Sequence, residues 1–323
     1  MAIQDNFWTI GNEAVAYGTR AATLTRGIEN QTDDVTPNVE HRVSQGMRPG
    51  TVATPVGRSV AHQYGGSVSL MLDIMANSLG LVFAGFGSSV ATTTPGGATL
   101  ARLHTIYPTT AGPTRSSTVH AGRYDMSGTV HHTDYLGCMG TELAVSQAAK
   151  GNATVKASYN YKTLDTAASS VTPSYPTNPT IFTDLDCTIT LDGAELTSSK
   201  QSDLTIQSGL AVDLDRIGGR RKPVLMDRVA CTGSLMTDYD DDDIFGKYLS
   251  GEDVPLVFSW MGALIEGSTY ESLTITLPAI QYTGSSPKVG VGVTPEQSAP
   301  FQVLDDLTNA PWKIEIVNAD TAV

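Results

Sequence analysis

The chain has 323 residues and a formal net charge of −13 at pH 7. Such an acidic surface repels nucleic acid and does not favour an anionic membrane, which excludes binding to either by simple charge attraction. Hydrophobic residues make up 40% of the chain, enough for a core, and few aromatics with many Gly, Ser and Thr residues favour β-structure. Three isolated cysteines without a CxxC pair predict reduced thiols in a protein made in a cytosol.

The first stretch, residues 1–65, is polar and rich in turn-forming residues. Short β-like pieces alternate there with Pro, Gly, Asn and Asp, as in IENQTDDVTPNVEHRV. This composition predicts an extended arm or long hairpin rather than a compact domain.

A strand is predicted to begin at HQYGGSVSLMLD. Apolar residues at helical spacing then predict a short helix over residues 71–79, ended by Gly80, with a buried strand over residues 81–86. Asp73 and Asn77 interrupt this apolar run, which favours buried elements over a membrane span. The Thr-, Gly- and Pro-rich residues 87–118 predict an inserted loop or hairpin.

The clearest strand covers residues 153–162, ATVKASYNYK, where apolar and polar side chains alternate. GCMGTELAVSQ before it predicts its hairpin partner, and residues 166–180 predict a second inserted loop. About ten strands against two helices predict a mainly β fold, an antiparallel sandwich or barrel with one or two short flanking helices and long arms. We assign residues 66–284 to this core and residues 285–323 to a C-terminal extension with no core of its own.

Two stretches share an order of features. GSVSLMLDIMANSLGLVF and TGSLMTDYDDDDIFGKYLSGEDVPLVF each give a strand, an aspartate, a short helix, a glycine and a strand with Leu-Val-Phe. This order suggests an internal duplication, with chance similarity as the alternative.

The acidic run Asp240–Asp243 has two interpretations. Ile244, Phe245, Tyr248 and Leu249 form one apolar stripe, and Gly251 stands where a C-terminal cap is needed, so the aspartates would begin a helix. A calcium loop would need alternating ligands and a turn glycine, both of which the run lacks. We therefore predict a solvated helix start and no metal site.

No other motif assembles chemistry. His132 and Asp134 in TVHHTDY can share a strand face, but adjacent His131 and His132 cannot. The only tight basic cluster, GGRRKP, predicts an exposed turn or charge pairing with a neighbouring chain through Arg220, Arg221 and Lys222. Phosphate-loop, dinucleotide and hydrolase motifs are absent, so we predict no catalytic residue and no cofactor. Trp260 and Trp312 lie in strand-like patterns that predict packing rather than sugar binding.

Across residues 60–260 the order of the pieces carries a resemblance. The series begins with VGRSVAHQYGGSVSLMLDIMANSLG and continues with the glycine-cysteine step and alternating strand of LGCMGTELAVSQAAKGNATVKASYNYK. It ends with DLTIQSGL, the basic-proline turn and TGSL before the acidic helix. In this order the pieces resemble the major tail tube proteins of long-tailed bacteriophages. The resemblance implies a virion structural protein, not an enzyme, made in the host bacterial cytoplasm. It implies hexameric rings that stack into a tube, through which viral DNA passes during ejection without specific binding and without a membrane partner. It also implies a tape-measure protein, a tail terminator and tail-tip proteins as partners.

Within this arm, the stretch Ile28–Arg58 is the expected inter-ring loop, because the arm has no core of its own and needs a neighbour for order. The candidate contact residues are Ile28, Asp33, Asp34, Val39, Arg42, Met47, Arg48 and Arg58. An acidic wall would let DNA pass without gripping it. Another virion β-protein, such as a capsid decoration or baseplate component, stays open as an alternative, as does a β-sandwich hydrolase or carbohydrate-binding module.

Overall fold

The computed structural model describes residues 6–44, 46, 50, 52–53, 59–177, 179–212, 215–284, 286–288 and 294–321. Within these residues the chain is mainly β with two short α-helices, and every pairing between its strands is antiparallel, which confirms the predicted fold class. No described helix combines the length and apolar character needed to cross a membrane.

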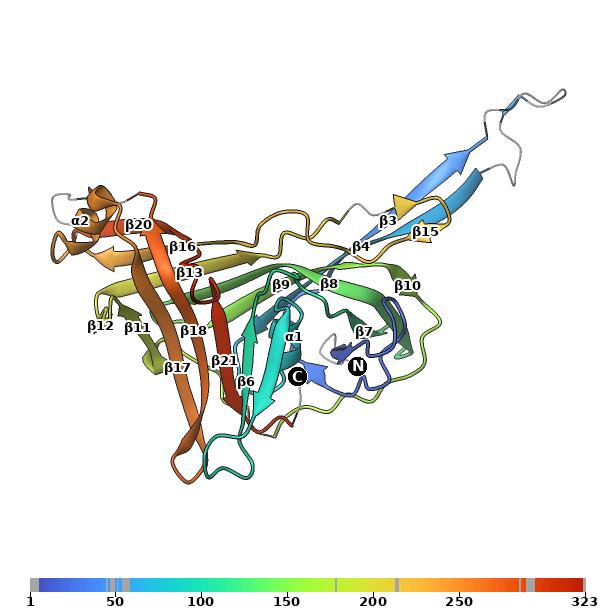
Figure 1. The fold of residues 1–323 in the computed structure, drawn as a ribbon. Coiled ribbons are helices and arrows are strands. Elements are labelled where there is room, and N and C mark those ends of the chain that lie inside the picture. The colour runs from blue at the N-terminus through green and yellow to red at the C-terminus, as the bar shows by residue number, and fades with distance from the viewer. Residues whose placement is uncertain are drawn as a thin grey trace.

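The strands form two large sheets that face each other (Figure 1). The first sheet runs in the order β3 (Asp34–Val43), β4 (Ser59–Asp73), β9 (Thr154–Tyr161), β8 (Val130–Ala148), β13 (Ser199–Gln207), β16 (Ala230–Asp238), β20 (Glu296–Val303) and β19 (Ser286–Lys288). The second runs in the order β12 (Ala194–Glu195), β11 (Cys187–Leu191), β17 (Val254–Glu266), β18 (Thr269–Tyr282), β21 (Lys313–Asn318), β6 (Arg102–Tyr107) and β5 (Ser89–Thr93).

The sheets meet at one edge, where the end of β18 pairs with β20. Between them lies a single apolar core, which includes the largest side chains of both sheets. Trp260 of β17 donates its indole N–H to the Gln147 side chain of β8 at 3.1 Å, so the core also contains a polar bond across the layers.

A smaller sheet shares the first half of β8. It runs β2 (Gly27–Ile28), β1 (Phe7–Asn12), β7 (Ser117–Tyr124), β8 and β10 (Thr163–Asp165). Gly137, with φ of +69°, lies where β8 leaves this sheet for the large one. A side chain there would meet Tyr17 and Lys162 within 3 Å, so both the bend and the close packing favour glycine.

The remaining elements are small. They are α1 (Gly80–Ala84), the 3₁₀ turn η2 (Asp184–Asp186), α2 (Asp243–Ser250) and the hairpin of β14 (Asp215–Arg216) and β15 (Gly219–Arg220). Helix α2 lies at one end of the molecule, and the β3–β4 hairpin projects from the other (Figure 1).

Local patterns with a clear period were predicted well. The strand predicted over residues 153–162 is β9, with Val155, Ala157, Tyr159 and Tyr161 all buried, and its predicted partner is the second half of β8. Trp260 and Trp312 are packed in the core, as predicted.

The helix and strand predicted over residues 71–86 were wrong. Strand β4 continues to Asp73, and the helix α1 covers the Leu-Val-Phe run that was expected to be a strand. The run is apolar all round because α1 is packed inside the molecule, where Tyr159 donates to the Val82 carbonyl at 3.0 Å. Periodicity cannot distinguish a short buried helix from a buried strand. The second Leu-Val-Phe lies in strand β17, so the two stretches differ in element order and the duplication stays a prediction.

Both chain ends contribute more to the core than expected. In the N-terminal stretch, β1 buries Trp8 and Ile10 in the small sheet. After residue 284, β20 and β21 complete the two large sheets and bury Phe301, Ile314 and Ile316. The C-terminal segment is therefore ordered by its own chain and needs no neighbour.

Candidate assembly surface

From here on, the term arm means the β3–β4 hairpin alone, which is the most exposed large element of the described chain. Nearly every residue of β3 and the first five residues of β4 are exposed. Before Gly66, β4 pairs only with β3 among the described strands, so no described strand pairs with either outer edge of the ribbon there. An isolated two-stranded ribbon is marginally stable in water, so the arm gains order when another surface covers it.

The two faces of the arm differ in chemistry. One carries Val39, His41 and Val43 opposite Gln63, Ala61 and Ser59. The other carries Glu40 and Arg42 opposite His62 and Val60, with the Arg42 guanidinium 5.4 Å from the centre of the Tyr64 ring. The arm thus offers an apolar face and a cationic, aromatic face.

Arg220 holds the base of the arm. Its guanidinium donates to the carbonyl oxygens of Tyr64 at 2.5 Å, Tyr161 at 3.0 Å and Val212 at 2.8 Å, and to the Asn160 side chain at 2.9 Å. Its side chain is only 12% exposed. The predicted pairing of Arg220 with a neighbouring chain is therefore corrected: this cation is engaged within its own chain.

The other two basic candidates lie on the surface. Arg221 and Lys222 are both exposed, and the Lys222 ammonium donates to the carbonyl of Thr114.

The predicted arm residues lie in different environments. Ile28 is 3% exposed in β2, so its side chain has no surface for a neighbour, and we remove it from the contact set. Asp33 accepts from Arg123 at 2.6 Å. Asp34, Val39 and Arg42 lie in β3, the last two on opposite faces of the arm. Met47, Arg48 and Arg58 lie outside the described residues.

A groove of about 790 Å³ lies between the cationic face of the arm and the β14–β15 turn. Its lining holds four cations, Arg42, Lys162, Arg216 and Arg220, and one carboxylate, Asp215. The Arg216 guanidinium donates to the backbone carbonyl of the preceding residue, Asp215, at 2.7 Å. The groove is thus a positive surface on a negative protein. The sequence missed it because its walls come from three separate segments.

The acidic run at the opposite end begins a helix, as predicted. Asp242 is the N-cap of α2, and Gly251 ends it with a φ of +68°. Asp243 pairs with Lys247 at 2.8 Å, but Asp240, Asp241 and Asp242 form no ion pair within the described chain. In the same described residues, no group of three or more His, Cys, Asp or Glu side chains is arranged to hold a metal ion.

A buried polar network was not found from the sequence. His120 of β7 lies directly opposite Asp134 of β8 and contacts its carboxylate at 2.6 Å, and the second imidazole nitrogen of His120 contacts His132 at 3.1 Å. Arg20 donates to the other oxygen of Asp134 at 2.5 Å. The turn residues Asp125–Gly128 between two strands could have indicated this register. The His120–Asp134 contact joins β7 to β8, so the network braces the small sheet.

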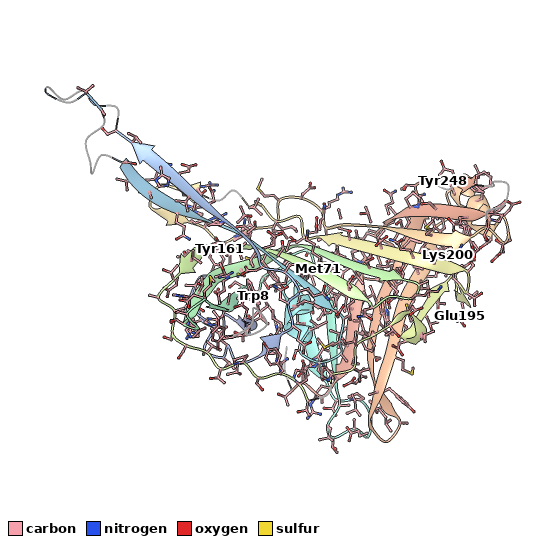
Figure 2. The ribbon with its side chains drawn as sticks, turned by 180° about the vertical axis from the view of Figure 1, so that it is seen from behind. Trp8, Met71, Tyr161, Glu195, Lys200 and Tyr248 are labelled. Atoms are coloured by element: carbon pink, nitrogen blue, oxygen red, sulfur yellow. The ribbon has the colours of Figure 1, made fainter. Side chains whose placement is uncertain are left out.

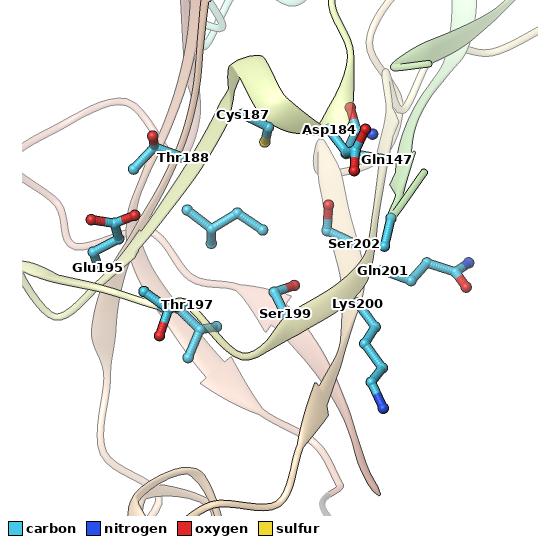
Figure 3. Close-up of a pocket in the computed structure, with 13 residues that line it drawn as sticks. Gln147, Asp184, Cys187, Thr188, Glu195, Thr197, Ser199, Lys200, Gln201 and Ser202 are labelled. Atoms are coloured by element: carbon cyan, nitrogen blue, oxygen red, sulfur yellow. The ribbon is translucent and has the colours of Figure 1, made fainter. Parts of the chain in front are cut away.

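A second hollow, of about 310 Å³, lies between β11, β12 and β13 (Figure 3). Burial, followed by the carboxylates of Asp184 and Asp186, raises the pKa of the Cys187 thiol to about 12, so it stays protonated and unreactive at neutral pH. The Lys200 ammonium points away from the hollow and pairs with Glu296 at 2.9 Å (Figure 3). Neither Cys187 nor Lys200 therefore offers an activated nucleophile to the hollow.

Comparison with known families agrees with a structural role. A family model described as "Phage tail tube protein" matches residues 5–303, nearly the whole chain. The search of curated proteins found no match.

Proposed function

The chain belongs to the phage tail tube protein family, and from this premise we propose that it assembles as hexameric rings that stack into a hollow tail tube. Membership implies a structural component of the virion tail. It favours this role over a capsid decoration, a baseplate component or a sugar-binding module. We further propose that the protein is made in the host bacterial cytoplasm.

The exposed arm is the observation that carries the proposal. A core that is complete within one chain does not need a ribbon with two unpaired edges and a solvent-facing apolar side. Val39 and Val43 are each about half exposed on that side. Covering them with a neighbouring ring would remove apolar surface from water and supply partners for the ribbon edges. The arm is therefore the proposed stacking element, with Asp33, Asp34, Val39, Arg42, Met47, Arg48 and Arg58 as its candidate contacts.

The charge supports the proposed conduction of DNA. A wall that neutralised phosphates would bind DNA and slow its passage, whereas carboxylates repel it over a Debye length of about 8 Å. The net charge of −13 supports such an acidic lumen. A tape-measure protein, a tail terminator and tail-tip proteins complete the proposed set of partners.

Electron microscopy of the purified protein tests the proposal. We expect stacked rings from the natural chain, and folded protein without tubes when residues 38–65 are replaced by Asn-Gly. That turn suits the remaining Pro37–Gly66 pair. Tubes of normal length from the shortened chain would refute the role of the arm. A natural chain that stays monomeric at every salt and protein concentration would refute the tail tube itself.

Point variants distinguish the effect of the arm's surface on stacking from the effect of shortening the chain. Val39→Asp with Val43→Asp places charge on the apolar face, and Val15→Asp with Val224→Asp makes the same change at exposed sites that are not part of the arm. We expect only the first pair to prevent stacking.

A further inference from the structure

The molecule carries opposite charges at its two ends. The cationic groove lies beside the arm, and the acidic turn, Asp240–Asp243, lies before α2 at the far end. Both views show these ends separated by the full width of the sheets, with Tyr248 of α2 on one side and Tyr161 near the arm on the other (Figures 1 and 2). One chain therefore cannot bring its own acidic turn into its own groove.

Two cations of the groove are available for ion pairing with a partner. Arg42 is 63% exposed, and its one ion pair, with Glu40, is 3.4 Å long and also exposed. Arg216 makes no ion pair within the described residues, and the side chain of Ile217 beside it is fully exposed. A cationic concavity with an apolar rim suits an acidic peptide segment.

The acidic turn has exposed carboxylates that are available for ion pairing with those cations. Asp240 and Asp241 are exposed and form no ion pair in the described chain. Neighbouring carboxylates repel each other, so a set of cations from another molecule would relieve this repulsion.

We propose that the acidic turn of one copy binds in the cationic groove of the next copy. The inference rests on the proposed function and adds the contact between neighbouring subunits. The two surfaces are different patches of one chain, so the contact is head-to-tail and repeats from copy to copy, which closes into a ring at a suitable rotation. Arg42 and Arg216 pair with Asp240 and Asp241 of the neighbour in the same ring, so this contact takes Arg42 out of the stacking set, and Arg220 keeps the groove in shape.

Charge reversal tests the contact. One variant carries Arg42→Glu with Arg216→Glu, and a second carries Asp240→Lys with Asp241→Lys. Each leaves the N-cap Asp242 and the clamp Arg220 in place. We expect each variant to raise the protein concentration needed for ring formation by about tenfold or more, because attraction becomes repulsion. The chain with all four changes should assemble close to the natural concentration, because the pairs are restored with reversed sign.

A matched control changes net charge without touching the groove. Lys156→Glu with Arg228→Glu alters two exposed basic residues by the same amount and should assemble like the natural chain. Sedimentation velocity and negative-stain images give the ring population, and thermal unfolding establishes that each variant is folded.

The outcomes separate the two proposals. A natural chain without rings refutes the proposed function. Natural rings, with both reversed variants assembling normally, refute only this contact, and so does a fourfold variant that is no better than either parent. A gel shift with duplex DNA covers another outcome. If the natural chain retards the DNA, and the Arg42→Glu, Arg216→Glu variant assembles normally but does not retard it, the groove binds DNA phosphates and the inference is overturned.

Discussion

At the residue scale, Arg220 joins the arm to the body of the protein. Replacing it with alanine leaves several partly buried carbonyl oxygens without a donor, so we expect Arg220→Ala to lower the free energy of unfolding by about 2–3 kcal/mol. Arg221→Ala, at the exposed neighbour, should change it by less than about 0.5 kcal/mol. Chemical denaturation of both variants measures the difference, and equal values would contradict the clamp.

The sequence could predict the charge of Arg220 but not its role. Its acceptors belong to β4, β9 and the loop before β14, which lie far apart along the chain. Arg221 beside it belongs to the same basic cluster and is exposed. Only the three-dimensional arrangement of these segments distinguishes the two arginines.

Glu266 gives a residue-scale prediction on pH. It accepts backbone N–H groups of Thr99, Leu100 and Ala101 at 2.6–2.8 Å, which joins the tip of the β17–β18 hairpin to the β5–β6 loop. These bonds, that of Ala101 first, lower the pKa of the carboxyl from 4.5 to about 2. A depressed acid pKa means that the contact contributes fully above about pH 4.5 and is lost as the pH falls through about 2.

We expect the three amide resonances to titrate with a midpoint near 2 in NMR spectra of the chain with residues 38–65 replaced. Glu266→Gln should abolish this titration. A midpoint near 4.5 in the shortened chain that keeps Glu266 would show that the hydrogen bonds do not form in solution.

At the element scale, two glycines of the α2 region should respond in opposite directions. Gly246 lies inside the helix, with open space where a Cβ atom would lie, so Gly246→Ala should stabilise the protein by about 0.5–1 kcal/mol. Gly251 ends the helix in the left-handed region, so Gly251→Ala should destabilise it by about 1–2 kcal/mol. Thermal unfolding compares the two variants. Destabilisation by both would argue against a helix across Gly246.

The local sequence signals of α2 explain why this helix was predicted correctly. Its apolar stripe, acidic start and terminal glycine all lie within about ten residues and agree with one another. Helix α1 also ends at a glycine, Gly85, but its first turn has no acidic residue and four of its five residues are buried, so it shows no apolar stripe beside a polar face. Tertiary packing decides its conformation, so local patterns led to the wrong element.

At the scale of the whole molecule, the sequence predicted the class of fold but not its closure. Alternation identifies single strands but not their partners: β18 pairs with β20 past the intervening β19, and β21 pairs with β6, far back in the chain. The C-terminal strands therefore looked like an extension although they complete both sheets. The cationic groove was missed for the same reason.

The edge of the arm has a consequence for the protein before it assembles. Free ribbons tend to add to one another and form disordered aggregates. Pro37 removes one backbone donor from β3, the bulge between Pro37 and Val39 breaks the regular spacing, and charged side chains follow on the next residues. We expect these irregularities to keep a concentrated pool of subunits dispersed until a growing template presents a surface that fits.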